Sequence, residues 1–358
     1  MTLDLVWDFN KVFLGNPIME TGMNSKLPLG KIDPKILGRL LSQYTSAGDR
    51  VLIGAGIGED AAIIDMGHIY LVAKTDPITH VTGEIGRYAV HINANDIASM
   101  GGSPLWFLAT ILMPSQTKAR DIKKIFSQIS GTCKELGIAY CGGHTEVTSS
   151  VTIPVVVGHM LGEVTRDNLK PTSGARNGDD LVMTKSAAIE ATAIIALEKE
   201  EELKTSFSGK FIRKAQDYLR EPGISVVKEA TLLRSMQGVH AFHDPTEGGL
   251  GNGIYEIATA SGLGVEVDRE KIPLAEETRL LCEYCHIDPL GAFASGSLLV
   301  AVSHSTSEKA IKNLLKAGVP ATRIGRMVPK KNGMKLIEAS RKLDLPVFHQ
   351  DELSKIFG

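Results

Sequence analysis

Hydrophobic residues along the chain form two kinds of pattern, short apolar runs and apolar positions spaced three or four residues apart. The runs predict strands, and the spacing predicts helices. In the first half of the chain the predicted strands are 69–73, 105–113, 137–141 and 152–164, and the predicted helices are 85–100 and 119–136. Strands that alternate with helices indicate an α/β fold.

The second half of the chain repeats this alternation. The predicted strands are 181–183, 239–244, 264–267, 297–302 and 322–328, and the predicted helices are 187–199, 207–236, one that ends near 260, and 306–317. A segment rich in Pro, Gly, Asn and Asp, residues 167–180, separates the two halves and is typical of a connection. We therefore predict two α/β domains.

The same pattern sets the predicted boundaries of these domains. The predicted parts are an N-terminal extension over 1–26, a first domain over 27–165, a second domain over 166–345 and a tail over 346–358. The first 26 residues show no sustained hydrophobic period and contain Gly, Asn and Pro, so we interpret them as an extension that precedes the fold.

Composition narrows the class of protein. Of the 358 residues, 43% are hydrophobic, which suffices for two folded cores. The formal net charge of −2 provides no positive field to hold nucleic acid or acidic lipid. No apolar run reaches the ~18 residues of a membrane span, the first residues lack a signal-peptide pattern, and the four cysteines form no disulfide framework. We expect a cytoplasmic protein that binds neither nucleic acid nor membrane.

Acidic residues recur where the apolar segments of the first domain end. Asp60 precedes an apolar run, Asp76 and Glu146 follow predicted strands, and Asp96 lies beside the apolar stripe of a predicted helix. A buried carboxylate needs a cation or several hydrogen-bond donors. Together these four side chains offer the hard oxygen ligands that suit Mg²⁺. Taken singly, each is also explained as a helix cap or a turn former.

Two glycine pairs stand beside acidic residues. The sequence GGHTEVT, residues 142–148, follows a predicted strand, and HDPTEGGL, residues 243–250, leads into a predicted helix. Glycine pairs form plain turns, or they leave the backbone bare for a ligand. A glycine loop before a helix exposes N–H groups that favour a phosphate. A helix capped by Asp244 or Thr246 explains the second motif equally well.

Three further features can each be interpreted in two ways. Lys74 lies two residues before Asp76 and either approaches a phosphate or forms a structural ion pair. His243 precedes the second glycine motif, where a role in a site and a structural role are both open. The pair Cys282 and Cys285 lacks the second pair of ligands that a zinc site needs, so we expect two ordinary thiols.

Five motifs in order along the chain, GIGEDAA, TDP, NANDIASMGGSP, GGHTEV and DPTEGGL, resemble those of the aminoimidazole ribonucleotide (AIR) synthase superfamily, in particular its branch of hydrogenase expression/formation proteins. The resemblance covers residues 27–345. It implies a PurM-like fold of two α/β domains, in a homodimer whose paired N-terminal sheets form a barrel. It also implies an enzyme that uses ATP and Mg²⁺ to phosphorylate an amide or carbonyl oxygen of a small substrate, as a dehydratase or a cyclo-ligase does.

The resemblance also assigns roles to residues of the motifs. Those it implies for catalysis are Asp60, Asp96, His144 and Glu146. Those it implies as Mg²⁺ ligands are Asp60, Asp76, Asp96 and Glu146. Those it implies for binding ATP and its phosphates are Gly58, Asp76, Asn95, Gly142, Gly143, Thr145, Asp244, Gly248 and Gly249.

Departures from the family pattern leave the reaction open. Hydrogenase expression/formation proteins carry a carbamoyl group on a C-terminal cysteine, whereas this sequence ends HQDELSKIFG. We therefore expect the acceptor to be a diffusible small molecule or a side chain of a partner. The motif TEGGL is also less rich in glycine than its counterpart in AIR synthase. Two other functions remain, a small-molecule kinase of the thiamine-phosphate kinase type and a non-catalytic ATP-binding regulatory protein.

Overall fold

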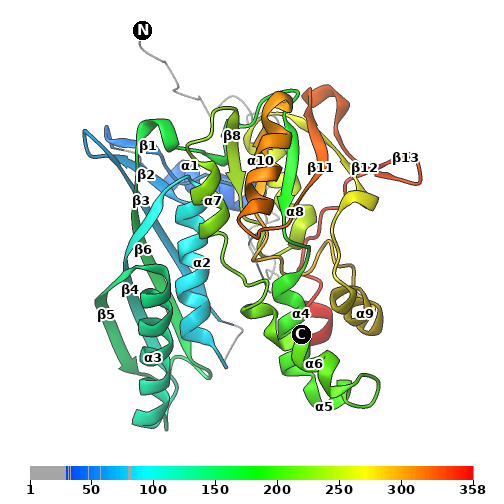
Figure 1. Ribbon diagram of the computed structural model, residues 1–358. Helices are drawn as coiled ribbons and strands as arrows, with labels where there is room; N and C mark the ends of the chain where they lie inside the picture. The colour runs from blue at the N-terminus through cyan, green and yellow to red at the C-terminus, as the bar shows by residue number, and fades with distance from the viewer. Residues whose placement is uncertain are drawn as a thin grey trace.

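The chain folds around two β-sheets, seen in the computed structural model in Figure 1. The structure describes residues 30, 32, 34–46, 48–56, 58–79 and 83–357. The predicted extension over residues 1–26 lies outside these residues. The domain boundaries stay a prediction, although one sheet is built from each half of the chain.

The first sheet has six strands in the order β1-β2-β3-β6-β4-β5. Their bounds are Val51–Ile53 (β1), Ala62–Asp65 (β2), Tyr70–Ile78 (β3), Ser103–Met113 (β4), Ala139–Val147 (β5) and Val155–Val164 (β6). Strands β4 and β5 are parallel, and the other neighbours are antiparallel. The sheet is mixed because helix α3, Ala119–Leu136, joins β4 to β5 as a crossover connection.

Helices α2, Ile85–Ser99, and α3 cover one face of the first sheet (Figure 1). In α3, Ala119–Leu136, the buried residues Ile125, Ile129 and Cys133 lie four positions apart and form one apolar stripe. Gly137 ends this helix in the left-handed conformation that glycine adopts without strain. The prediction of this helix is confirmed at both ends.

The opposite face of the first sheet carries apolar side chains that are only partly buried. They include Leu71 of β3, Leu108 and Leu112 of β4 and Val157 of β6. Side chains alternate between the two faces of a strand, so these residues point away from α2 and α3. A row of apolar side chains on an open face favours cover by another surface.

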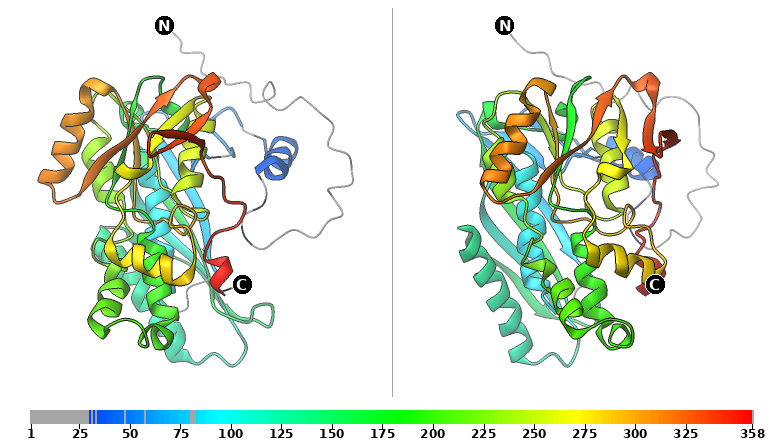
Figure 2. Two further views of the ribbon diagram at one scale, coloured as in Figure 1. Left: turned by 90° about the vertical axis from the view of Figure 1, so that its right-hand side faces the viewer. Right: turned by 45° about the vertical axis from the view of Figure 1, so that its right-hand side comes forward.

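The second sheet has seven strands in the order β13-β12-β9-β11-β7-β10-β8. Their bounds are Asp180–Thr184 (β7), Val239–His243 (β8), Gly264–Asp268 (β9), Leu299–Val302 (β10), Ala321–Val328 (β11), Met334–Glu338 (β12) and Arg341–Asp344 (β13). The central strands β7 and β10 are buried along their whole length, as their apolar runs predict. Figure 2 shows this sheet from two further sides.

Some helices of the second half lie beside this sheet, and others lie below it in the view of Figure 1. Their bounds are Ile189–Glu198 (α4), Glu200–Leu203 (α5), Gly209–Gln216 (α6), Val227–Leu233 (α7), Gly249–Ala260 (α8), Glu276–Cys285 (α9), His304–Lys316 (α10) and Ser354–Phe357 (α11), and the N-terminal helix α1 spans Pro34–Tyr44. None of the helices in the described ranges is both long and apolar enough to span a bilayer.

Helix α2, Ile85–Ser99, lies between the two halves, and nearly all its residues are buried. Ala89 and Val90 pack in the apolar core of the first sheet. Tyr88 and Ile92 pack instead with α4 in an apolar cluster of the second half. One helix therefore contributes to both cores.

Three predicted elements differ from the structure. Strand β3 continues through Asp76, because its residues 74–78 pair with β6. Strand β5 continues through Gly142 and Gly143, because glycine reaches the positive φ angles of 135° and 143° found there and the pairing with β4 resumes after a bulge. The predicted helix 207–236 divides into α6 and α7, because Pro222 and Gly223 interrupt it.

Candidate functional site

Three aspartates from distant parts of the sequence meet between the two sheets. Asp60 precedes β2, Asp96 lies in α2, and Asp244 follows β8. One carboxylate oxygen of each lies within 4.8 Å of the others. Asp96 and Asp244 are only 4% and 3% exposed. The cluster thus contains Asp60 and Asp96, two of the four acidic residues that we expected as metal ligands, together with Asp244 from the second half.

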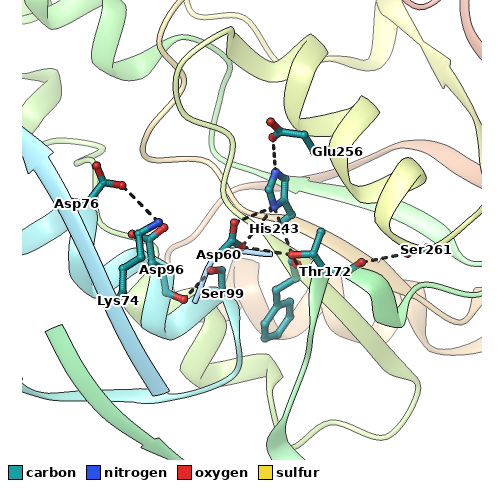
Figure 3. Close-up of polar contacts among 10 residues, drawn as sticks. Asp60, Lys74, Asp76, Asp96, Ser99, Thr172, His243, Glu256 and Ser261 are labelled. Atoms are coloured by element: carbon teal, nitrogen blue, oxygen red, sulfur yellow. Dashed lines mark hydrogen bonds and ion pairs between the residues drawn. The ribbon is translucent and has the colours of Figure 1, made fainter. Parts of the chain in front are cut away.

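Lys74 of β3 brings a positive charge to this group, as Figure 3 shows. Its Nζ lies 3.3 Å from Oδ2 of Asp96 and 3.4 Å from Oδ2 of Asp76. Burial opposes the charge on Lys74, but these carboxylates outweigh it and raise the pKa of the ammonium group. The ion pair that the sequence left open is therefore present, and it lies inside the acidic cluster.

His243 links Asp60 to helix α8 (Figure 3). Its Nδ1 lies 3.2 Å from Oδ1 of Asp60, and its Nε2 lies 2.9 Å from Oε2 of Glu256. Burial disfavours the imidazolium, yet the Asp60 and Glu256 carboxylates raise the pKa of His243 well above its usual range. In turn His243 overcomes the effect of burial on Asp60 and lowers the pKa of that carboxyl. His243 is thus a positively charged support of the cluster.

Asp244 has the least compensated charge of the three aspartates. Both its carboxylate oxygens are buried, and neither has a hydrogen-bond partner within the described part of the chain. Burial, followed by the negative charge of Asp60, raises the pKa of Asp244 to about 8. Burial likewise raises the pKa of Asp96 well above its ordinary value. A buried carboxylate in this condition is stabilised by a cation.

The cluster fits a divalent cation in charge and in ligand type. When all four are ionised, Asp60, Asp76, Asp96 and Asp244 carry more negative charge than Lys74 and a protonated His243 offset. Carboxylate oxygens are also the ligands that Mg²⁺ prefers, and it keeps several waters or phosphate oxygens in addition. The residues present therefore fit Mg²⁺ bound together with a nucleotide.

Two of the four acidic residues expected as metal ligands are not among the three aspartates whose oxygens lie within 4.8 Å of one another. Asp76 is joined to this group through Lys74, which also pairs with Asp96. Glu146 is exposed on β5, where His144 Nε2 lies 3.2 Å from its Oε2. Asp76 is in register with Gly143 across β6 and β4, which places the two backbones three strand spacings, or about 14 Å, apart. Within one copy of the chain, the residues of β5 therefore lie apart from the three aspartates.

The glycine pair of β5 borders a separate groove. Gly142, Gly143 and Thr145 line a hollow of about 300 Å³ together with the aromatic rings of Phe126 and Tyr140. A side chain at position 143 would overlap the backbone of β4 at Ala109, which explains that glycine by packing. The bare backbone that we predicted is present, but it lies on the edge strand β5, which β4 and β6 separate from Lys74 and Asp76 of β3.

Two other residues expected at the nucleotide have structural contacts. Asn95 is fully buried, its Nδ2 donates to the carbonyl of Ile224 at 2.8 Å, and its Oδ1 accepts from the N–H of Val226 at 2.9 Å. This geometry favours a role in joining α2 to the second half. Gly58, with φ of 83°, packs against α8 near Glu256, and so it brings the loop before Asp60 towards the cluster.

The second glycine motif leads into α8, as predicted, but one N–H group at the start of this helix already has a partner within the chain. Gly248 and Gly249 have φ angles of 83° and 74°, which favour glycine. The N–H of Gly248 donates to Oδ2 of Asp351, at 2.8 Å, from the C-terminal segment. A carboxylate of the chain therefore takes the place that we expected for a phosphate. Sequence reasoning missed Asp351, because 103 residues separate it from this loop.

Two family models match the chain. The N-terminal domain of AIR synthase related proteins matches residues 58–164, and the C-terminal domain of the same proteins matches residues 176–336. The two matches follow one another in the order that the sequence motifs predict. Together they include all three aspartates of the cluster.

Individual proteins support the same assignment. A putative hydrogenase expression/formation protein of Methanocaldococcus jannaschii is 27% identical over 310 residues, which are 82% of this chain and 89% of that protein. A selenide, water dikinase of Dechloromonas aromatica is 30% identical over 258 residues, which are 70% of each chain. The crystal structure of the hydrogenase maturation protein HypE in complex with ATP has a TM-score of 0.68 at 20% identity and covers 87% of this chain and 90% of that one. The chain belongs to the AIR synthase-related, PurM-like family of ATP-dependent enzymes.

Proposed function

We propose that this enzyme binds Mg-ATP at the cluster of Asp60, Asp96 and Asp244 and phosphorylates an amide or carbonyl oxygen of a small substrate. The observation that carries the proposal is the buried carboxylate of Asp244, whose two oxygens lack partners in the described chain beside two further aspartates. Bound Mg²⁺ would neutralise charge on the phosphates during transfer. The family membership supports ATP as the phosphoryl donor.

Residues of the chain would position the reacting groups. Asp60, Asp96 and Asp244 supply oxygen ligands from both halves of the chain. Lys74 lies against Asp96 and is placed to attract a phosphate oxygen once the metal binds the carboxylates. His243 fixes the orientation of Asp60 and keeps it ionised. In this arrangement catalysis comes from positioning and from charge stabilisation.

A homodimer would complete the site. The apolar face of the first sheet, with Leu108 and Leu112, needs cover, and a second copy offers an identical surface. His144 and Glu146 lie exposed on the edge strand β5, apart from the aspartates of their own chain. We propose that a second copy brings these two residues to the nucleotide, where Glu146 would bind Mg²⁺ and His144 a phosphate or the substrate.

The test is Mg-dependent binding of ATP, measured by calorimetry. Replacing the Asp244 carboxylate by an amide, Asp244→Asn, should weaken binding by at least about 10-fold, as the loss of a metal ligand or its support does. Asp96→Asn should act in the same direction. The matched control is Glu201→Gln, because the Glu201 side chain is 87% exposed and far from the cluster in sequence. Equal affinities for the Asp244 variant and this control would refute the proposed site.

Formation of ADP separates the enzyme from a regulatory protein that only binds ATP. The enzyme should release ADP when its acceptor is present, and the Asp244→Asn variant should not. A binding protein would hold Mg-ATP with the same dependence on Asp244 and release no ADP with any acceptor. A kinase of the thiamine-phosphate type would instead transfer phosphate to a phosphate group of its acceptor, which mass spectrometry of the product distinguishes from an amide product.

A further inference from the structure

The chain after β13 crosses the second half of the protein and is fixed at two points. It is drawn in red in Figure 2, where it runs from the second sheet towards α11. Leu345 is buried in the apolar cluster that contains Leu250 of α8. Leu353 is buried in a different cluster, together with Leu281 of α9. Residues 345–353 therefore form a C-terminal strap with a buried leucine at each end.

The C-terminal strap passes the start of α8 and is tied to it by three hydrogen bonds. Oδ2 of Asp351 accepts the N–H of Gly248 at 2.8 Å. The side chain of Asn252 binds the backbone of Phe348 twice, because its Nδ2 donates to the carbonyl at 2.8 Å and its Oδ1 accepts the N–H at 2.9 Å. A side chain at position 248 would overlap the Asn252 amide, so this contact requires glycine there. The start of α8 and the strap thus form one packed unit.

Asp351 is itself held in place on the C-terminal strap. Its second oxygen, Oδ1, accepts the N–H of Leu353 at 2.9 Å. Oε2 of the next residue, Glu352, accepts the N–H of Asp288 at 3.0 Å and so ties the strap to the loop after α9. Asp351 therefore meets Gly248 from a fixed support, which limits how far the start of α8 can move.

The loop before α8 carries this constraint to the candidate Mg-ATP site. Only three residues separate Gly248 from Asp244. One of them, Pro245, packs against α8 at Gly253, where an added side chain would meet the proline ring. A loop this short cannot move far from the helix on which it packs. The position of Asp244 therefore depends on the position of the start of α8.

Asp244 needs support, because its carboxylate is buried beside two others. One of its oxygens lies within 4.8 Å of an oxygen of Asp60 and of Asp96, and neither of its oxygens has a hydrogen-bond partner in the described part of the chain. Before a cation binds, charge repulsion and lost hydration favour a loop position that carries Asp244 towards water. A fixed loop opposes this movement and keeps the three aspartates in place for the metal.

We propose that Asp351 is a positioning residue of the Mg-ATP site, which acts through Gly248 on the loop that presents Asp244 to the metal. The inference rests on the function proposed above. It adds to that function a residue beyond position 336, where the match to the C-terminal family model ends. A carboxylate suits this role, because the N-terminal end of a helix carries partial positive charge. Loss of Asp351 should therefore weaken the binding of the metal.

The test measures the Mg²⁺ concentration at which ATP binding to the full chain is half-maximal, by calorimetry. Asp351→Ala should raise this concentration by about 10-fold, as the loss of a residue that orients a metal ligand does. Asp351→Asn keeps one acceptor oxygen and should raise it less. The matched control is Glu352→Gln, because Glu352 is buried next to Asp351 and its carboxylate binds the N–H of Asp288 and the ammonium of Lys355 instead of α8. This control should leave the Mg²⁺ concentration unchanged.

A double-mutant cycle distinguishes positioning from a general loss of structure. Asp244→Asn alters the ligand that Asp351 positions, so adding Asp351→Ala to it should weaken Mg-dependent binding little further. Two effects that multiply in full would show that Asp351 does not act through Asp244, and they would overturn the inference. If Asp351→Ala does not fold, Asp351→Asn is taken through the same cycle.

The outcomes also separate this inference from the function on which it rests. A wild-type protein without Mg-dependent ATP binding would overturn the proposed function. Normal binding by the wild-type protein, with the Mg²⁺ concentration unchanged in both Asp351 variants, would overturn the role of Asp351 alone. A shift in Glu352→Gln as large as that in Asp351→Ala would overturn it too.

Discussion

His91 is expected to make the fold sensitive to acid, and the size of the effect follows from its surroundings. The side chain lies in α2, is 4% exposed, and neither ring nitrogen has a hydrogen-bond partner among the described residues. Burial, with smaller contributions from the positive charges of Arg87 and Lys185, lowers the pKa of His91 from 6.5 to about 3. The folded protein therefore keeps this imidazole neutral over a range in which the unfolded chain protonates it.

The sign and magnitude come from proton linkage. Because the unfolded state binds the extra proton between the two pKa values, stability is fully present above the unfolded pKa and falls as the pH decreases towards the folded one. Between about pH 7 and about pH 5, this group alone should remove about 2 kcal/mol from the free energy of unfolding. His91→Leu removes the titrating group at similar volume, so the variant should lose less stability over this interval.

Urea unfolding at several pH values measures the difference. The free energy of unfolding of His91→Leu minus that of the wild-type protein should increase as the pH is lowered, by about 2 kcal/mol over the interval above. His68→Leu is the control, because His68 is exposed. A difference that stays constant with pH would show that His91 is not held neutral by burial, and the reasoning would be wrong.

Three further variants test features of the fold. Leu108→Glu places a charge on the open apolar face of the first sheet, so light scattering should report a monomer if that face forms the dimer, and an unchanged dimer would contradict the proposal. Gly143→Ala should lower thermal stability and disturb the edge of the sheet, because the added Cβ would overlap the backbone of Ala109, whereas Gly131→Ala, with open space around its Cβ, should not. Phe348→Ala should cost about 2 kcal/mol in urea unfolding, less than the roughly 3–5 kcal/mol of a fully buried phenylalanine, because its partly buried ring packs against Gly251 and Gly291. A loss no larger than that of an exposed control such as Phe357→Ala would show that this contact is weak.

The sequence predicted the elements whose patterns are regular. Helix α3 and strand β4 were placed within two residues, because each has a clear period in its apolar residues. Short strands such as β1, β12 and β13 were not predicted, since three to five residues carry too little pattern. The helix predicted over 207–236 was wrong in the middle, where Pro222 and Gly223 outweigh the apolar spacing.

The candidate site was predicted less completely than the fold, for a physical reason. Motif order singled out Asp60, Asp96 and Asp244, and the structure brings them together. The motif order did not show that Asp244 lies closer to Asp60 and Asp96 than Asp76 or Glu146 does. This distance depends on how the second sheet packs against α2. Contacts such as that between Gly248 and Asp351 depend on the same docking and leave no local signal.

Helix α2 should limit how far the two sheets can move relative to one another. It contributes Ala89 to one core and Tyr88 to the other, and Asn95 joins it to the second half through two hydrogen bonds. A hinge between the sheets would have to open one of these cores and break both bonds. We therefore expect the angle between the two sheets to stay fixed through each catalytic cycle, so that reactants enter and leave by the movement of loops at the rim.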